Sequence, residues 1–112
     1  MWYDIKNNKI SKIEKLAGEY EIWMIGVLPY GKMKVKIYEA ENRTFSGRTN
    51  IQIKRKFDGM PEAAVGFGKT IEETIEDVVE WFLKMQQEDY SEKQYPEGIP
   101  EEAIEYVDLQ DF

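Results

Sequence analysis

The clearest alternation of apolar and polar residues lies between residues 71 and 85, where apolar side chains recur at helical spacing. The stripe that would face a core consists of Ile71, Ile75, Val78, Val79, Phe82 and Met85. Thr70 stands directly before the stripe and Glu73 follows three residues later, which is the arrangement of a capping box. The pattern therefore predicts a helix that begins after Thr70.

A period of two residues predicts strands in the middle of the chain. Residues 19–41 are typical of a hairpin with its loop at Tyr30-Gly31, where Gly31 supplies the positive φ that such turns need. In this register the apolar face would pair Leu28 with Met33, Gly26 with Val35 and Met24 with Ile37.

Three further elements follow from the pattern. Residues 50–57 predict a third strand, and residues 62–67 predict a short edge strand. The inward side chains of the third strand would be Ile51, Ile53 and Phe57. Near the N-terminus, residues 8–18 predict a helix that Asn8 caps and Gly18 ends. The apolar face of that helix would contain Ile10, Ile13, Leu16 and Ala17.

These elements predict an α+β fold, an antiparallel sheet of three or four strands with helices packed on one face. The order would be helix, three strands, a possible fourth strand and a helix, followed by an acidic tail with a short helix that begins at Pro100. A length of 112 residues suits one domain. We expect residues 1–88 to form it and residues 89–112 to be an acidic C-terminal extension docked onto it.

Composition narrows the chemistry. The chain has no cysteine and no histidine, which removes thiolate nucleophiles, disulfides and the commonest general base and metal ligand. The remaining carboxylates would need to converge in a pocket to act as catalysts or to bind Mg²⁺. We therefore expect no enzyme activity, no catalytic residue, no metal site and no cofactor. No apolar run approaches the roughly 20 residues of a membrane span, and residues 1–10 lack an apolar signal core, so we expect a cytoplasmic protein.

The tripeptide Gly68-Lys69-Thr70 ends like a phosphate-binding loop. The complete motif requires another glycine five positions before Gly68, where the chain has Ala63. The backbone of this segment therefore lacks the freedom to wrap a phosphate, and the tripeptide is interpreted as the turn that begins a helix.

Charge is distributed unevenly along the chain. The total is −7, yet residues 32–57 carry a net charge of +6 and residues 58–112 carry −13, while residues 1–31 are balanced. Alternation places the lysines of the basic segment on the outer face of the sheet, beside Trp23, Ile25, Val27 and Tyr38. This lysine face is either solvated, or covered by the chain's own tail, or a surface that binds nucleic acid or an acidic partner. Its candidate nucleic-acid contacts are Trp23, Lys34, Lys36, Tyr38, Lys54 and Lys56.

The acidic segment begins on the outer face of the predicted helix after Thr70. One interpretation is a solvated helix face, and the other is a carboxylate surface that binds a basic partner. The residues of the second interpretation are Glu72, Glu73, Glu76, Asp77, Glu80 and Trp81. Trp81 lies at the edge of the core stripe, where it could serve either side.

Residues 60–82 resemble the HicB-type antitoxins, in which a strand leads through a turn into a helix packed on a small antiparallel sheet. The matching residues are Met60, Pro61, Thr70, Glu72 and Glu73. Thr74 stands where that family usually has alanine. The order of elements is also similar to double-stranded RNA-binding domains, which place lysines at the start of the second helix. Here those positions are Ile71, Glu72 and Glu73, which disfavours duplex RNA binding at that helix.

The leading functional hypothesis is a non-catalytic, acidic protein-binding module of the inhibitor or antitoxin kind, of the type encoded by phages or mobile elements. It would neutralise a basic protein that handles nucleic acid. The alternative is direct nucleic-acid binding through the lysine face. The partner, the organism and the oligomeric state remain open at this point.

Overall fold

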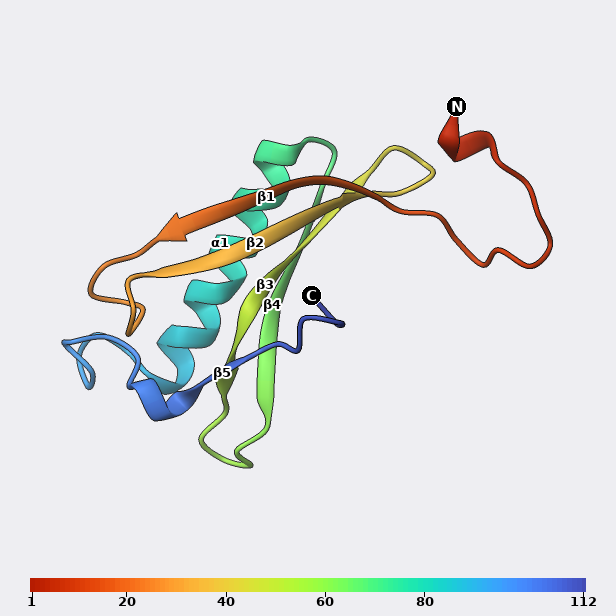
Figure 1. Cartoon of the computed structure of the whole chain (residues 1–112). Coiled ribbons are helices and arrows are strands. Elements are labelled where there is room, and N and C mark those ends of the chain that lie inside the picture. The colour runs from red at the N-terminus through yellow and green to blue at the C-terminus, as the bar shows by residue number, and fades with distance from the viewer.

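A computed structural model describes residues 1–112 and contains a five-stranded antiparallel sheet with one long helix on one of its faces (Figure 1). Strands β1 (Lys15–Trp23), β2 (Lys32–Glu39), β3 (Phe45–Lys54) and β4 (Pro61–Gly68) lie side by side in chain order. Helix α1 (Ile71–Asp89) follows them. The α+β class and the antiparallel sheet with a helix on one face are therefore as predicted.

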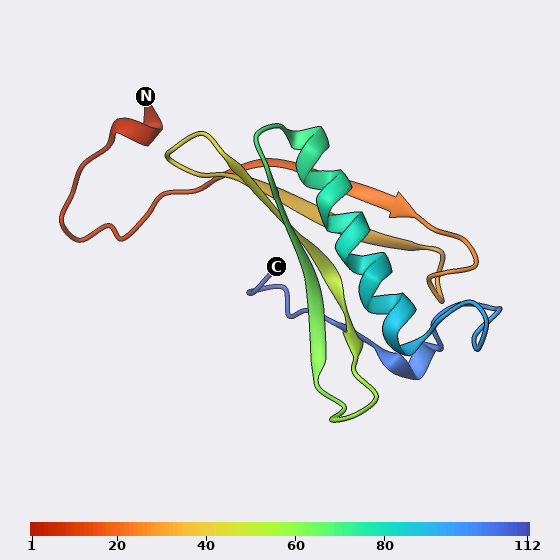
Figure 2. The ribbon, with the colours of Figure 1, turned by 180° about the vertical axis from the view of Figure 1, so that it is seen from behind.

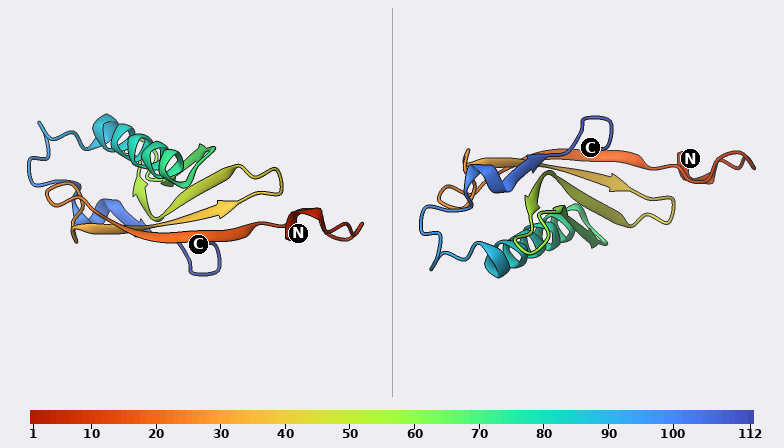
Figure 3. Two further views of the ribbon diagram at one scale, coloured as in Figure 1. Left: turned by 90° about the horizontal axis from the view of Figure 1, so that it is seen from above. Right: turned by 90° about the horizontal axis from the view of Figure 1, so that it is seen from below.

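The C-terminal segment returns to the sheet. A 3₁₀ turn, η2 (Glu101–Ala103), leads into the short strand β5 (Ile104–Tyr106). The first half of β3 pairs with β2, and its second half, Ile51–Ile53, pairs with β5. Residues that follow β5 cross the face of the sheet opposite α1 (Figure 3). A second 3₁₀ turn, η1 (Trp2–Asp4), lies near the N-terminus.

The core lies between α1 and the inner face of the sheet, where the two elements remove apolar side chains from water. Val78 and Phe82 of the helix are fully buried. The sheet contributes Met33, Val35, Ile37, Ile51, Ile53 and Ala64. The predicted helix stripe is thus turned toward the sheet, with Ile71, Ile75 and Met85 at its margin. Val79, which is also predicted in the stripe, is half-buried and does not belong to this core cluster.

Two polar residues of α1, Thr74 and Gln86, are also fully buried, which the apolar pattern does not indicate. Each satisfies its polar group locally. Thr74 donates its hydroxyl to the carbonyl of Thr70 at 2.8 Å, and Gln86 donates its amide to the carbonyl of Tyr90 at 2.9 Å. Both hydrogen bonds are made within the helix and its ends. The two side chains can therefore be buried without a hydrogen-bond partner on the sheet.

Figure 2 shows α1 on its face of the sheet. The N-terminal half of the helix packs closely against β4 and also contacts β3. Glycines on the inner face allow this approach. A Cβ atom at Gly66 would lie 2.5 Å from the backbone nitrogen of Val78, and one at Gly47 would lie 2.9 Å from the Val78 side chain. The sheet has no side-chain layer at these positions, so the helix rests on the strands themselves.

The predicted N-terminal helix over residues 8–18 is wrong, because β1 begins at Lys15 and residues 8–14 form no helix. Tyr20 and Ile22 of β1 lie opposite Val35 and Met33 of β2. This segment has an alternating pattern that continues after Gly18, and pairing with β2 outweighs the weak helical spacing of the apolar residues before it. Only one helix therefore packs on the sheet.

The hairpin between β1 and β2 is present, but its predicted register is wrong. Trp23 pairs with Lys32 and Ile22 with Met33, so the loop spans residues 24–31. Gly31 does have a positive φ of 82°. The longer loop is held by the distant C-terminal segment, since the N–H of Ile99 donates to the carbonyl of Val27 at 2.9 Å. Leu28, in this loop, is buried in the core.

The third strand also differs from its predicted bounds. It begins at Phe45 and ends at Lys54, and a turn closed by the N–H of Arg55 on the carbonyl of Met60 follows it. Ile51 and Ile53 point inward as predicted, whereas Phe57 lies in the turn and is 83% exposed, so its inward placement is wrong. Gly59, with a φ of 71°, lies in the turn that joins β3 to β4.

None of the helices combines the length and the apolar character that crossing a membrane requires.

Candidate protein-binding surface

The start of α1 determines where its carboxylates project. The hydroxyl of Thr70 accepts the N–H of Glu73 at 3.1 Å, as the capping box predicts. The carboxylate of Glu73 accepts an N–H in return, that of Lys69 at 2.9 Å rather than that of Thr70. These two bonds close the first turn of the helix.

All six residues of the predicted partner-binding set are exposed and lie on α1, in two rows. Glu72, Glu76 and Glu80 follow one another at intervals of four residues on the side away from the sheet, and we call them the acidic row. Glu73, Asp77 and Trp81 lie on the flank of the helix that borders β4. The helix thus brings the predicted residues together, but on two neighbouring surfaces.

The acidic row forms no ion pair within the chain. Lys84 lies one turn after Glu80, yet its ammonium group is 5.9 Å from the centre of the Trp81 ring and makes no salt bridge. Like charges at this spacing repel one another by a few tenths of a kcal/mol per pair. A cationic partner would relieve this repulsion.

Asp77 has a structural bond that the sequence analysis missed. Its carboxylate accepts the N–H of Phe67 in β4 at 2.9 Å and so holds the strand to the helix. The available signal was its residue type, because aspartate is a poorer helix former than the glutamates around it and is often retained for a specific hydrogen bond.

Strand β4 is another element of this surface that the sequence analysis missed. It pairs only with β3, so its second side is a free sheet edge. Val65 is 44% exposed and Phe67 is 66% exposed on the face away from α1, and Trp81 is 46% exposed on the helix flank. Exposed apolar side chains beside an open edge are a feature of protein-binding surfaces.

The structure distributes the candidate residues of the lysine face over two regions. Trp23, Lys34, Lys36 and Tyr38 lie on the outer face by strand alternation, and Lys54 ends β3 on the same side. Lys56 lies beyond the strand, with its ammonium group 4.5 Å from the centre of the Tyr95 ring and 5.2 Å from that of Tyr90. Ile25 and Val27 lie in the hairpin loop, so their predicted place on the strand is wrong.

Carboxylates from β1 neutralise part of the lysine face. Glu21 lies 3.3 Å from the ammonium group of Lys32, and Glu19 lies 4.0 Å from that of Lys36. The predicted register does not bring these pairs together, because it extends the first hairpin strand to Leu28, whereas β1 ends at Trp23.

The C-terminal segment covers another part of the lysine face. The side chain of Phe112 is buried there, with the ammonium group of Lys36 4.4 Å from the ring centre. The Phe112 carbonyl accepts the hydroxyl of Tyr38 at 2.8 Å, and the N–H of Val107 donates to the carbonyl of Asn50 at 2.8 Å. Of the three alternatives for this face, coverage by the chain's own tail therefore describes the region around Lys36 and Tyr38.

A further contact joins the C-terminal segment to the hairpin loop. The hydroxyl of Tyr30 donates to the carboxylate of Glu101. This hydrogen bond raises the pKa of the Tyr30 phenol above its usual value, because ionisation would place two negative charges side by side.

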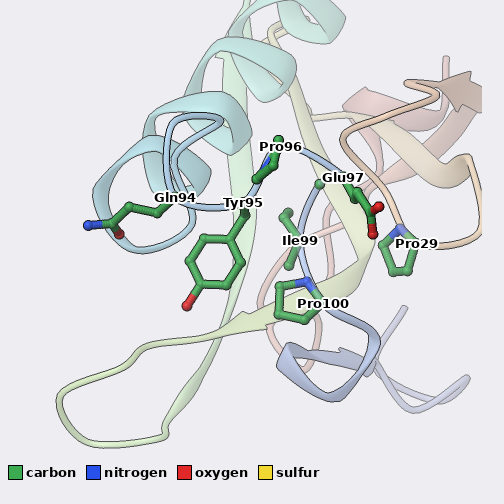
Figure 4. Close-up of a pocket in the computed structure, with 8 residues that line it drawn as sticks. Pro29, Gln94, Tyr95, Pro96, Glu97, Ile99 and Pro100 are labelled. Carbon is green, nitrogen blue, oxygen red and sulfur yellow. The ribbon is translucent and has the colours of Figure 1, made fainter.

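A hollow of about 430 Å³ lies in the loop after α1 (Figure 4). Its walls contain Pro29, Pro96, Pro100 and Ile99 together with Tyr95 and Glu97. The Tyr95 ring and the Glu97 carboxylate point in different directions, so no pair of titratable groups converges in it. No group of three or more carboxylates is placed so that it could hold a metal ion.

Comparison of the chain with known protein families, with curated proteins and with solved structures gave no match.

Proposed function

We propose that this protein is a non-catalytic, acidic binding module that captures a basic, nucleic-acid-handling protein and blocks it. The observation that supports the proposal is the acidic row of α1, three exposed carboxylates without an ion pair within the chain, next to the exposed ring of Trp81. The net charge of −13 over residues 58–112 would attract a basic partner over a distance and raise the association rate.

Charge alone does not give a tight complex, because affinity depends on buried apolar anchors. Trp81 is the anchor closest to the acidic row, and tryptophan is among the residues that contribute most to interfaces. The resemblance of residues 60–82 to HicB-type antitoxins implies the same role, an inhibitor that neutralises a toxic partner. A cytoplasmic location would suit such a role.

Reversing the acidic row tests this proposal. We expect Glu72→Lys, Glu76→Lys and Glu80→Lys together to leave the fold intact, since these side chains make no bond to the rest of the chain. The association rate with the partner should fall by about tenfold or more. The measurement is surface plasmon resonance with the partner identified by affinity purification from native host cells. Asp77 is left unchanged because it holds β4.

A control variant carries the same change in net charge elsewhere, at Glu92, Glu97 and Asp111, and should keep most of the association rate. Complex formation that is equally fast in the wild-type chain and in the acidic-row variant would refute the proposed function.

Direct nucleic-acid binding through the lysine face is the second candidate, favoured by the charge of +6 over residues 32–57. Because Phe112 and the carboxylates of β1 occupy part of this face, we expect no binding of the whole chain to single- or double-stranded oligonucleotides at low salt. Fluorescence anisotropy over a range of salt concentrations measures it. Binding whose logarithm falls with the logarithm of salt by about 0.9 per neutralised phosphate on duplex DNA would support this alternative instead.

A further inference from the structure

The free edge of β4 carries unpaired backbone groups. The N–H of Ala64 donates to the hydroxyl of Thr49 in β3, so the even-numbered residues of β4 point their backbone groups toward β3. Successive residues of a strand point to opposite sides, and the groups of Ala63, Val65 and Phe67 therefore point outward. The outward N–H of Phe67 is taken by Asp77, which confirms this alternation. No strand receives the N–H and C=O of Val65.

The side chains on the two faces of this edge differ in character. The face away from α1 presents Val65 and Phe67, both exposed and apolar. The face toward α1 presents carboxylates, because Glu62 lies on the inner face of β4 and Asp77 and Glu73 reach it from the helix. A strand added here would therefore meet apolar groups on one face and negative charge on the other.

The opposite edge of the sheet, β1, is protected in the way that natural sheets protect their edges. The N–H of Met24 donates to the carbonyl of Gly31, so the backbone N–H and C=O groups of the odd-numbered residues of β1 point away from β2. Glu19 and Glu21 are two of these residues, and their carboxylates pair with lysines of β2. The register of β1 also shifts between Leu16 and Gly18. β4 lacks such charges at its centre.

We propose that β4 binds an extended segment of a basic protein as an added strand, in which cationic side chains alternate with apolar ones. The cationic side chains would face Glu73 and Asp77, and the apolar ones would pack on Val65 and Phe67. Strand addition of this kind obtains affinity from backbone hydrogen bonds and specificity from alternate side chains. The proposal rests on the proposed function, since it specifies how the basic partner is held.

Asp77 would change partners on binding. The added strand would accept the N–H of Phe67, and the carboxylate of Asp77 would then pair with a cationic side chain. A second copy of this chain fits the edge less well, because pairing β4 with its symmetry mate would bring the Asp77 and Glu73 carboxylates of both copies together. Charge complementarity therefore favours a basic strand over self-association.

The test uses a blocked seven-residue peptide of alternating lysine and valine, with a glutamate–valine peptide of the same length as its control. Calorimetry measures binding, and amide hydrogen exchange locates it. We expect the lysine–valine peptide to bind and to protect the N–H of Val65, and the glutamate–valine peptide not to bind.

Two proline variants test the edge directly. Val65→Pro removes an outward N–H without breaking a bond to β3 and should weaken peptide binding by about tenfold or more. Glu21→Pro removes an outward N–H on the edge of β1, together with the ion pair to Lys32, and should leave binding unchanged. Val65→Ala keeps the N–H and separates the loss of the side chain from the loss of the donor. The melting temperature of each variant shows that it is folded.

The proposal is overturned if the lysine–valine peptide does not bind, if both proline variants bind it equally well, or if protection appears in β1. If the chain dimerises with increasing concentration and Val65→Pro abolishes the dimer, the occupant of the β4 edge is a second copy of the chain and not a basic strand. If the partner protein binds Val65→Pro as well as the wild-type chain but associates slowly with the acidic-row variant, strand addition is refuted and the proposed function stands. If the peptide binds at β4 but the acidic-row variant associates with the partner as fast as the wild-type chain, the proposed function is refuted and strand addition stands.

Discussion

Truncation of Phe82 to alanine is expected to lower the free energy of unfolding by about 3–5 kcal/mol. The side chain is fully buried between α1 and the inner face of the sheet, so its removal takes away apolar burial and leaves a cavity. Domains of this size have a total stability of about 5–15 kcal/mol, so the loss is a large share of the whole. Urea denaturation followed by circular dichroism measures it through the midpoint and slope of the transition.

The neighbouring Trp81 is the matched control for this substitution. Its ring is 46% exposed, so Trp81→Ala should change the free energy of unfolding much less than Phe82→Ala. An unchanged melting temperature in Phe82→Ala, or a larger loss in Trp81→Ala, would mean that α1 presents a different face to the sheet.

Gly66→Ala is expected to destabilise the protein by about 1–3 kcal/mol or more, although it adds only one methyl group. The new Cβ would lie 2.5 Å from the backbone nitrogen of Val78, and backbone cannot rotate away as a flexible side chain can. The helix must therefore move off β4 and lose contacts along its N-terminal half. Thermal unfolding measures the change, and amide exchange at residues 74–82 reports whether the helix loosens there.

Val65→Ala is the control on the same strand, because Val65 lies next to Gly66 but points to the exposed face. It should alter stability by much less than Gly66→Ala. A Gly66→Ala protein as stable as the wild-type chain would show that α1 does not lie as close to β4 as the structure places it.

The same contact explains why α1 could be predicted from sequence while its distance from the sheet could not. The stripe that contains Val78 and Phe82 indicates which side of the helix is buried. A glycine in a strand indicates only that a side chain is missing there. The backbone of α1 occupies the space of the missing side chain. This arrangement depends on how β3, β4 and α1 pack together.

The N-terminal region shows how a local pattern can mislead. Residues 10–17 have apolar residues at helical spacing, but no surface exists for such a helix to cover, and stability of a short helix comes mainly from packing. Residues 15–23 instead obtain backbone hydrogen bonds from β2. The predicted hairpin register failed for a related reason, since Ile99, more than 70 residues away from Val27 in sequence, supports the longer loop.

The candidate site divides in the same way. The exposed positions of Glu72, Glu76 and Glu80 follow from helical periodicity and a capping box, and sequence is sufficient for them. The bond between Asp77 and Phe67 and the free edge of β4 require knowledge of which strand ends the sheet. Strand order is a property of long-range pairing, and local sequence carries little information about it.

Local sequence by itself determined α1 with its cap at Thr70, because the hydrogen bonds of a helix are short-range. It also determined the inward positions of Ile51 and Ile53, which follow from the alternation of side chains along a strand. The tertiary structure decided that β1 begins at Lys15 with no helix over residues 8–18, and it decided the register of the first hairpin and the covering of Lys36 by Phe112. It also decided which strand edge stays open. The physical reason is that a helix satisfies its own backbone, whereas each strand depends on a partner that lies elsewhere in the chain.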